Sequence, residues 1–368
     1  MLFDVEQKVM KSLLTLVLAA TLGMLAVVIW PAGTDERDAA TTNEKRSERS
    51  KDHVIGSVPV APPRASTGDK RPPFAAQLSK PITGADLESW LASKEGDSHS
   101  LGEALVIAGL ITNSPDLIRQ GIETDPENGH LLFIGATLTA FSAEERLAMS
   151  MRLLEADPEN GLAAFIHASH LLGAGQSDAA IEMMRSSTER TRIDDFGIET
   201  QLLMDEAYGA AGISPGAAKL RSAYNLQMPY LSDLRSLVSS LKGMEGSFTT
   251  GEASELQSLT ASMGHRLADQ SRSGRLVSTL MGFSLEEATL AGLPDAAPSP
   301  YMGLTVAQAR ESIVAERQAI RQEMVNLPDV EEILSADPEL MGRYIDRVRL
   351  TGELEATKWL HLETERAR

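Results

Sequence analysis

Apolar positions are concentrated first in an uncharged run from Ser12 to Trp30. At about 1.5 Å per residue, a helix over this run spans roughly 28 Å, which is enough to cross the hydrocarbon core of a bilayer. Two lysines precede the run and a proline follows it. The pattern predicts a short tail at residues 1–11 and a single transmembrane helix at residues 12–30.

The alternative for the same run is a signal peptide that is removed. Such a peptide has an apolar core of about 7–15 residues and a cleavage site of small residues behind it. Here the run is longer and ends in Ile29-Trp30-Pro31, which favours an anchor that stays in the chain. Lys8 and Lys11 favour a cytoplasmic N-terminus, although basic residues at 37–49 oppose it. We expect membrane localisation with the body on the extracytoplasmic side, which in a bacterium is the periplasm.

Residues 31–83 contain seven prolines, a charged block and few large apolar side chains. Such a segment cannot bury enough apolar surface to offset the entropy lost on ordering. The composition predicts a flexible linker between the membrane and the body.

From residue 84 onward, apolar residues recur at helical spacing and strand-like alternation is scarce. Ala, Leu, Glu, Met and Gln dominate, and all of them favour helices. The sequence therefore predicts an all-α body. Four capping boxes mark expected helix starts: Ser100 with Glu103, Ser142 with Glu145, Ser284 with Glu287, and Thr305 with Gln308.

An internal repeat is the strongest signal in the sequence. The pentapeptide at 125–129, Asp-Pro-Glu-Asn-Gly, recurs at 157–161, and Phe133-Ile134 aligns with Phe165-Ile166 at the same offset of 32. The aspartate before proline is driven out of the α region, so it ends a helix, and Asn-Gly supplies a turn and an N-cap. A period in the thirties is typical of stacked helical hairpins, which bury their apolar faces against their neighbours.

At these residues the sequence resembles the tetratricopeptide repeat. Segment 161–184 has Ala168, Gly175 and Ala180 at that family's small and turn positions. It departs from the family at Ala164, where a tryptophan is usual, and in its period of 32 rather than about 34. Weaker hairpins are expected on both sides, at 101–111 with 115–123 and at 195–211 with 215–225. The resemblance thus implies an α-α hairpin solenoid over residues 84–225.

The resemblance also implies a concave groove that binds a peptide and is lined by the first helix of each hairpin. The matching positions are His130, Phe133 and Thr137 in one copy and Leu162, Phe165 and Ser169 in the next. The alternative is that the two phenylalanines pack between hairpins.

The remaining chain is predicted to be helical without a clear repeat. Residues 226–292 should form additional helices, at about 230–242, 252–270, 273–282 and 285–291. A proline-rich break at 293–300 precedes a C-terminal helical region at 301–368. Within that region a long helix at 306–326 should pack on the body, because Glu316 interrupts its apolar seam. Two or three helices are expected at 329–366.

Composition and charge exclude several classes of protein. The chain of 368 residues has no cysteine, which excludes disulfides, thiolate metal sites and a cysteine nucleophile. Residues 1–83 hold 11 basic and 9 acidic residues, so the rest of the chain has 23 basic and 43 acidic residues, a net charge of −20. This acidity argues against a nucleic-acid partner and favours cationic ones.

No motif in the sequence is a strong candidate for catalysis or metal binding. Gly212-Ile-Ser214-Pro-Gly216 matches a hydrolase elbow in letters, but a helical sequence precedes it where the elbow needs a strand. Ser214 as an N-cap before Pro215 explains the same letters. His167 and His170 lack a third metal ligand at suitable spacing, and the loop at 125–129 is unlike a calcium site. We predict no catalytic residue, no metal and no cofactor.

The function that these features favour is a membrane-anchored helical-repeat scaffold that recruits a protein partner of unknown identity, rather than an enzyme. Two alternatives stay open at this point. One is an enzyme with a pair of carboxylates in a helical body, which spacing alone cannot locate. The other is a structural subunit of an envelope complex that docks through its C-terminal helices.

Overall fold

The computed structural model describes residues 74–244, 250–270, 276–291, 293–300, 303–325 and 337–367. The predicted tail, the transmembrane helix at 12–30 and most of the predicted linker lie outside the described residues. None of the helices within these ranges has the length and apolar character needed to cross a membrane.

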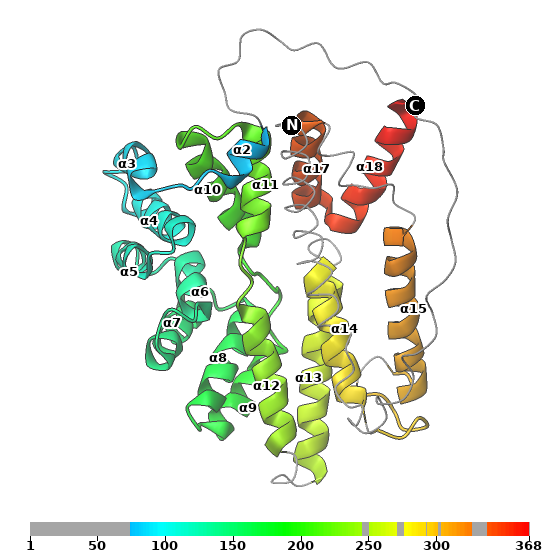
Figure 1. Cartoon of the computed structure of the whole chain (residues 1–368). Coiled ribbons are helices and arrows are strands. Elements are labelled where there is room, and N and C mark those ends of the chain that lie inside the picture. Colours follow the sequence, from blue (N-terminus) through cyan, green and yellow to red (C-terminus); the bar gives the residue numbers. More distant parts are fainter. Residues whose placement is uncertain are drawn as a thin grey trace, which may run out of the picture.

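The described residues form an all-α body without strands (Figure 1). Its helices, in chain order, are α2 (Phe74–Ser79), α3 (Gly84–Ala92), α4 (Ser98–Thr112), α5 (Pro115–Thr124), α6 (Gly129–Thr137), α7 (Ala143–Ala156), α8 (Gly161–Gly173), α9 (Ser177–Ser187), α10 (Gly197–Ala210), α11 (Pro215–Asn225), α12 (Tyr230–Met244), α13 (Thr250–Gln270), α14 (Leu276–Leu290), α15 (Val306–Val325), α17 (Pro338–Thr351) and α18 (Glu353–Ala367).

The repeated pentapeptide forms the same turn in both copies. Asp125 and Asp157 follow the last residue of α5 and α7, and their backbone N–H groups close the preceding helix. The side-chain oxygen of Asn128 accepts from the N–H of His130 at 3.0 Å, and that of Asn160 accepts from the N–H of Leu162 at 3.1 Å. Each asparagine thus satisfies an N–H group that would otherwise lack a partner at the start of a helix.

Four helical hairpins follow one another: α4 with α5, α6 with α7, α8 with α9, and α10 with α11. The first three stack in sequence order, because α5 packs on α6 and α7 packs on α8. Both hairpins expected beside the repeated pair are therefore present. The body is repeat-like in its helix packing, as the periodicity predicts.

The fourth hairpin departs from a linear stack. Apart from its hairpin partner α11, the first helix, α10, has α3 and α4 as its main neighbours, and Figure 1 shows it beside them rather than beside α8 and α9. The segment between α9 and α10 explains this return. Arg192 pairs with the turn before α8, where its N–H donates to Glu159 O and its carbonyl accepts from Gly161 N. The segment is thereby fastened along the second repeat turn and directs the chain back to the first hairpin.

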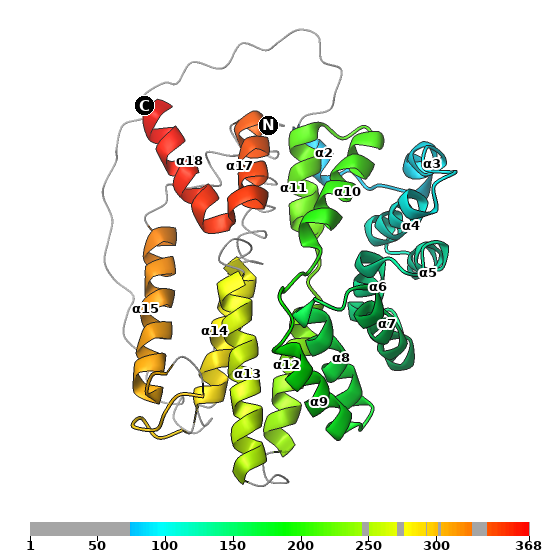
Figure 2. The ribbon, with the colours of Figure 1, turned by 180° about the vertical axis from the view of Figure 1, so that it is seen from behind.

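Helix α12 covers α8 instead, and α13 and α14 form a long hairpin next to it (Figure 2). The expected helices at 273–282 and 285–291 are one continuous helix, α14. Ser284 does not cap a new helix, because its hydroxyl donates to Leu280 O inside α14. The long helix predicted at 306–326 is α15, and its buried Val306 and Ile313 pack on α14 as expected.

Two of the four predicted capping boxes are present, and the two at Ser100 and Ser284 are absent. Ser142 with Glu145 and Thr305 with Gln308 form the reciprocal bonds. Ser100 does not start a helix, because α4 begins at Ser98 after an N-cap at Asp97.

One boundary also differs from the sequence expectation. Residues 74–79, assigned to the linker, form α2, which packs on α11. The buried Gln77 side chain explains the attachment, because its oxygen accepts from the N–H of Ser214 at 2.7 Å. Ser214 is the residue before Pro215 at the start of α11, so the letters that resemble a hydrolase elbow form a helix start, as predicted.

The C-terminal hairpin, α17 with α18, is fastened to the repeat body through α11. The guanidinium of Arg349 in α17 is buried and donates two hydrogen bonds to the carboxylate of Asp205 in α10. A second pair joins Lys219 to Asp346 at 2.5 Å. Helices that are distant in sequence are therefore connected by charged side chains as well as by apolar packing.

Candidate protein-binding cleft

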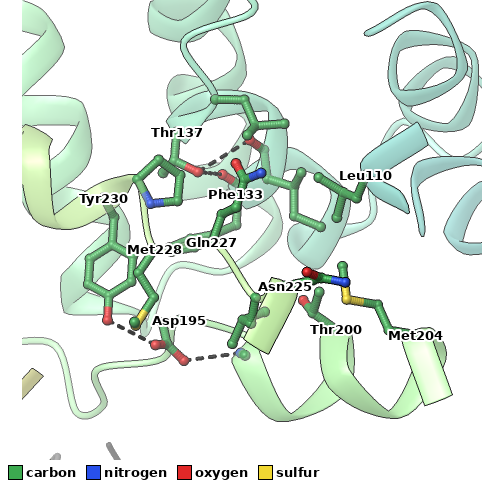
Figure 3. A pocket seen from close by; sticks show the side chains of 15 residues that line it. Leu110, Phe133, Thr137, Asp195, Thr200, Met204, Asn225, Gln227, Met228 and Tyr230 are labelled. Atoms are coloured by element: carbon green, nitrogen blue, oxygen red, sulfur yellow. Dashed lines mark hydrogen bonds between the residues drawn. The ribbon is translucent and has the colours of Figure 1, made fainter. Parts of the chain in front are cut away.

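A cleft lies where the returning hairpin meets the first repeat copy. Its walls are α6, α10 and the connector from Asn225 to Tyr230, with Leu110 of α4 at one side (Figure 3). It encloses about 500 Å³ of empty space, which includes solvent at its mouth. The cleft exists because α10 turns back towards α4, so a linear stack of hairpins would not contain it.

The lining of the cleft is mainly apolar. The large apolar side chains among the lining residues include those of Phe133, Leu138, Met204, Met228 and Tyr230. Phe133 and Tyr230 contact each other with ring centroids 5.9 Å apart. Methionine and aromatic side chains together can adapt to different apolar ligands.

Asp195 is the one charged residue among those that line the cleft. Its carboxylate accepts from the hydroxyl of Tyr230 at 2.9 Å and from the N–H of Gly197 at 3.0 Å, as Figure 3 shows. The adjacent Asp194 is half-buried, and desolvation raises the pKa of its carboxyl group. The floor of the cleft therefore carries a fixed carboxylate whose hydrogen bonds hold its orientation.

The backbone before α10 places this carboxylate. Phe196 has a left-handed conformation, with φ 51°, and its N–H donates to the Asp194 side chain at 3.0 Å. Asp194 is itself bonded to Asn160, whose side-chain oxygen accepts the Asp194 N–H at 3.1 Å. The second repeat turn thus fixes the segment that carries Asp195.

His130 connects α6 to α10. Its Nε2 lies 2.8 Å from the hydroxyl of Thr200, and its ring stacks on Phe196 with centroids 5.6 Å apart. Its Nδ1 faces Glu103, at 3.8 Å. The proximity of His130 is the main cause that lowers the pKa of Glu103. His130 is buried, so its visible role is to position the wall of the cleft.

The six residues expected at the groove fall into two groups. Phe133 and Thr137 line the cleft, and the Thr137 hydroxyl donates back into α6, to Phe133 O and Ile134 O. The other four lie elsewhere, and of these His130, Leu162 and Phe165 are buried in packing, whereas Ser169 is half-buried and donates to Asp233 O of α12. In the second copy, α12 covers the face that the resemblance assigns to a groove.

The histidines singled out in the sequence have separate partners. His167 Nδ1 lies 2.9 Å from the Ser150 hydroxyl, and His170 Nε2 donates to Ala136 O at 2.9 Å. Burial lowers the pKa of both, that of His170 to about 4. The part of the chain that the structure describes holds no cluster of three metal-ligating side chains.

Sequence reasoning missed the returning segment at 188–196 and the connector at 225–229. No sequence motif marks Arg192. Its partners in the turn before α8 are distant in sequence and come close to it only in the folded structure. A usable signal was present at Met228, since the residue before a proline is restricted to extended conformations.

We compared the chain with known proteins. No protein-family model matches it, and neither a curated protein nor a solved structure resembles it significantly. The cleft must therefore be interpreted from its own chemistry.

Proposed function

We propose that this protein is a membrane-anchored helical scaffold whose body recruits a protein partner through the cleft between α6 and α10. The anchor of this proposal is residues 12–30, and the lysines before it favour a body on the extracytoplasmic side. The tetratricopeptide-like hairpins supply the frame, and no cofactor or metal takes part.

One observation carries this proposal: an apolar, solvent-open cleft with one fixed carboxylate and two exposed polar residues, Asn225 and Gln227, at its border. Apolar surface with a few placed polar groups is the composition of binding sites in general. A single carboxylate, rather than a pair, lines it. This arrangement suits recognition of a chain segment better than acid–base catalysis, which needs partners for the proton.

The test is affinity capture of the tagged full-length chain from detergent-solubilised membranes, with the cleft blocked. Asn225→Trp places a large side chain at the mouth, whereas Asn225→Ala removes the same hydrogen bond to Tyr208 without filling the space. We expect a discrete partner with the wild type and with the alanine variant, and its loss with the tryptophan variant. Equal capture by all three would contradict the cleft as the site.

A second candidate is docking through the C-terminal hairpin. Leu350 and Leu362 are large apolar side chains that are 79% and 52% exposed. Arg343 and Arg347 flank the Trp359 ring, each 6.0 Å from its centroid. The double variant Leu350→Ser with Leu362→Ser separates the two candidates, because it should leave capture through the cleft unchanged.

A further inference from the structure

The connector between α11 and α12 presents unpaired backbone groups at the mouth of the cleft. Among the described residues, the N–H groups of Leu226, Gln227 and Met228 find no acceptor, and the carbonyls of Leu226 and Gln227 accept no backbone N–H. Leu226 is extended, with φ −67° and ψ 109°, and Pro229 restricts Met228 to the same region. The connector is therefore extended at Leu226 and Met228, and it has free backbone polar groups like those of a strand edge.

The same residues also belong to the lining of the cleft. Leu226 and Met228 are half-buried there, whereas Gln227 is exposed. A backbone edge beside an apolar cavity is the arrangement by which an extended peptide binds: main-chain hydrogen bonds supply affinity and alternate side chains enter pockets. A helical ligand would leave these groups unpaired, because its own N–H and C=O groups are already bonded.

From these two observations we infer that the cleft binds an extended, strand-like segment of the partner along residues 226–228. This inference rests on the proposed function and specifies its ligand. An apolar side chain of the segment occupies the cleft, and the backbone of the segment pairs with the connector.

Charge defines a second feature of the segment. Asp195 is the charged residue that lines the cleft, and its carboxylate is oriented by Tyr230 and Gly197. A lysine or arginine beside the apolar residue of the segment therefore complements the site, in agreement with the net charge of −20 beyond residue 83.

The probe is a random dodecapeptide library, selected on the full-length chain in detergent. Enriched peptides should combine Lys or Arg with apolar residues. N-methylation at every second residue of one such peptide removes the N–H groups on one edge of the extended chain. We expect one set of alternate methylations to weaken binding about tenfold or more and the other set to have little effect. Equal effects of both sets would overturn strand pairing.

Two readouts on the protein complete the test. Bound peptide should slow amide hydrogen exchange at residues 226–228, and unchanged exchange there would overturn the inference. Asp195→Asn should weaken a basic peptide several-fold and reduce the salt dependence of binding, whereas Asp116→Asn, at a fully exposed site on α5, serves as the charge control.

The inference and the proposed function can fail separately. A captured partner that depends on the cleft, with no extended peptide bound, would overturn the inference and leave the scaffold function intact. Peptides that pair with the connector in the absence of any captured partner would overturn the scaffold function and leave the cleft as a peptide site.

Discussion

The guanidinium of Arg349 holds the carboxylate of Asp205 through two hydrogen bonds, of 2.6 and 3.0 Å, and its Nε donates to Gln201 at 3.0 Å. Arg349 is 6% exposed and Asp205 is 17% exposed. These contacts join the C-terminal hairpin to α10, the helix that also forms one wall of the cleft. The C-terminal hairpin is therefore attached to a wall of the cleft by a buried ion pair.

We predict that Arg349→Ala lowers the free energy of unfolding by about 3–5 kcal/mol, because it leaves Asp205 buried and without its cation. The measurement is chemical denaturation of the full-length chain in non-ionic detergent. The control is Lys219→Ala, which removes a more exposed ion pair and should cost no more than about 1 kcal/mol. Equal losses of unfolding free energy for the two variants would contradict the claim that the ion pair of Arg349 with Asp205 is the main attachment of the C-terminal hairpin.

The two repeat turns should differ in their contribution to stability. Asn128→Ala removes an N-cap and contacts with the side chains of Asp125 and His99 at a half-exposed position, and should cost about 1 kcal/mol. Asn160→Ala removes an N-cap and two further bonds, to the N–H and the carbonyl of Asp194, at a position that is fully buried. We therefore expect the larger loss for Asn160→Ala, measured as the free energy of unfolding. A smaller loss than for Asn128→Ala would show that the returning segment is not held there.

Asp233 should make the body less stable as the pH rises. Burial raises its pKa to about 6, despite Arg146 at 3.5 Å. The pKa of Asp233 in the folded protein lies above the unfolded value of about 3.8. Its contribution to the free energy of unfolding is therefore complete below pH 3.8 and is lost as the pH rises through 6. Asp233→Asn should therefore gain up to about 3 kcal/mol relative to wild type between pH 4 and pH 7. A difference in unfolding free energy that does not change with pH would contradict this.

His170 should act in the opposite direction. Its pKa of about 4 lies below the unfolded value of 6.5, so its contribution is complete above pH 6.5 and is lost as the pH falls towards 4. His170→Gln keeps a donor for Ala136 O and removes this titration. Relative to the variant, the wild type should lose up to about 3 kcal/mol between pH 7 and pH 4. The check is a pH series of denaturation curves, and parallel curves would exclude His170 as the source.

The sequence predicted the local structure well where a signal lies within a few residues. The pentapeptides at 125–129 and 157–161, the cap at Ser142 and the turn before Pro215 all act over one helical turn, so the chain nearby determines them. Ser284 shows the limit of such signals, since its hydroxyl finds an acceptor one turn back in a helix that simply continues.

The arrangement of the hairpins could not be predicted in the same way. It depends on the contact of Arg192 with the turn before α8 and on the insertion of Arg349 beside Asp205, both between segments distant in sequence. Phe133 and Thr137 were chosen as groove residues by analogy with a linear repeat, and they line the cleft in a different setting. The connector at 226–228 lies outside the repeat pattern and carries only the weak signal of Pro229.

The central claim is that a partner binds at the cleft, and site-specific photocrosslinking in cells tests it most directly. A photoreactive residue replaces Gln227, which is exposed at the border of the cleft, or Leu362, which is exposed on α18. We predict a discrete crosslinked protein from position 227 and none from position 362. Crosslinking from position 362 alone, or from neither position, would contradict the claim.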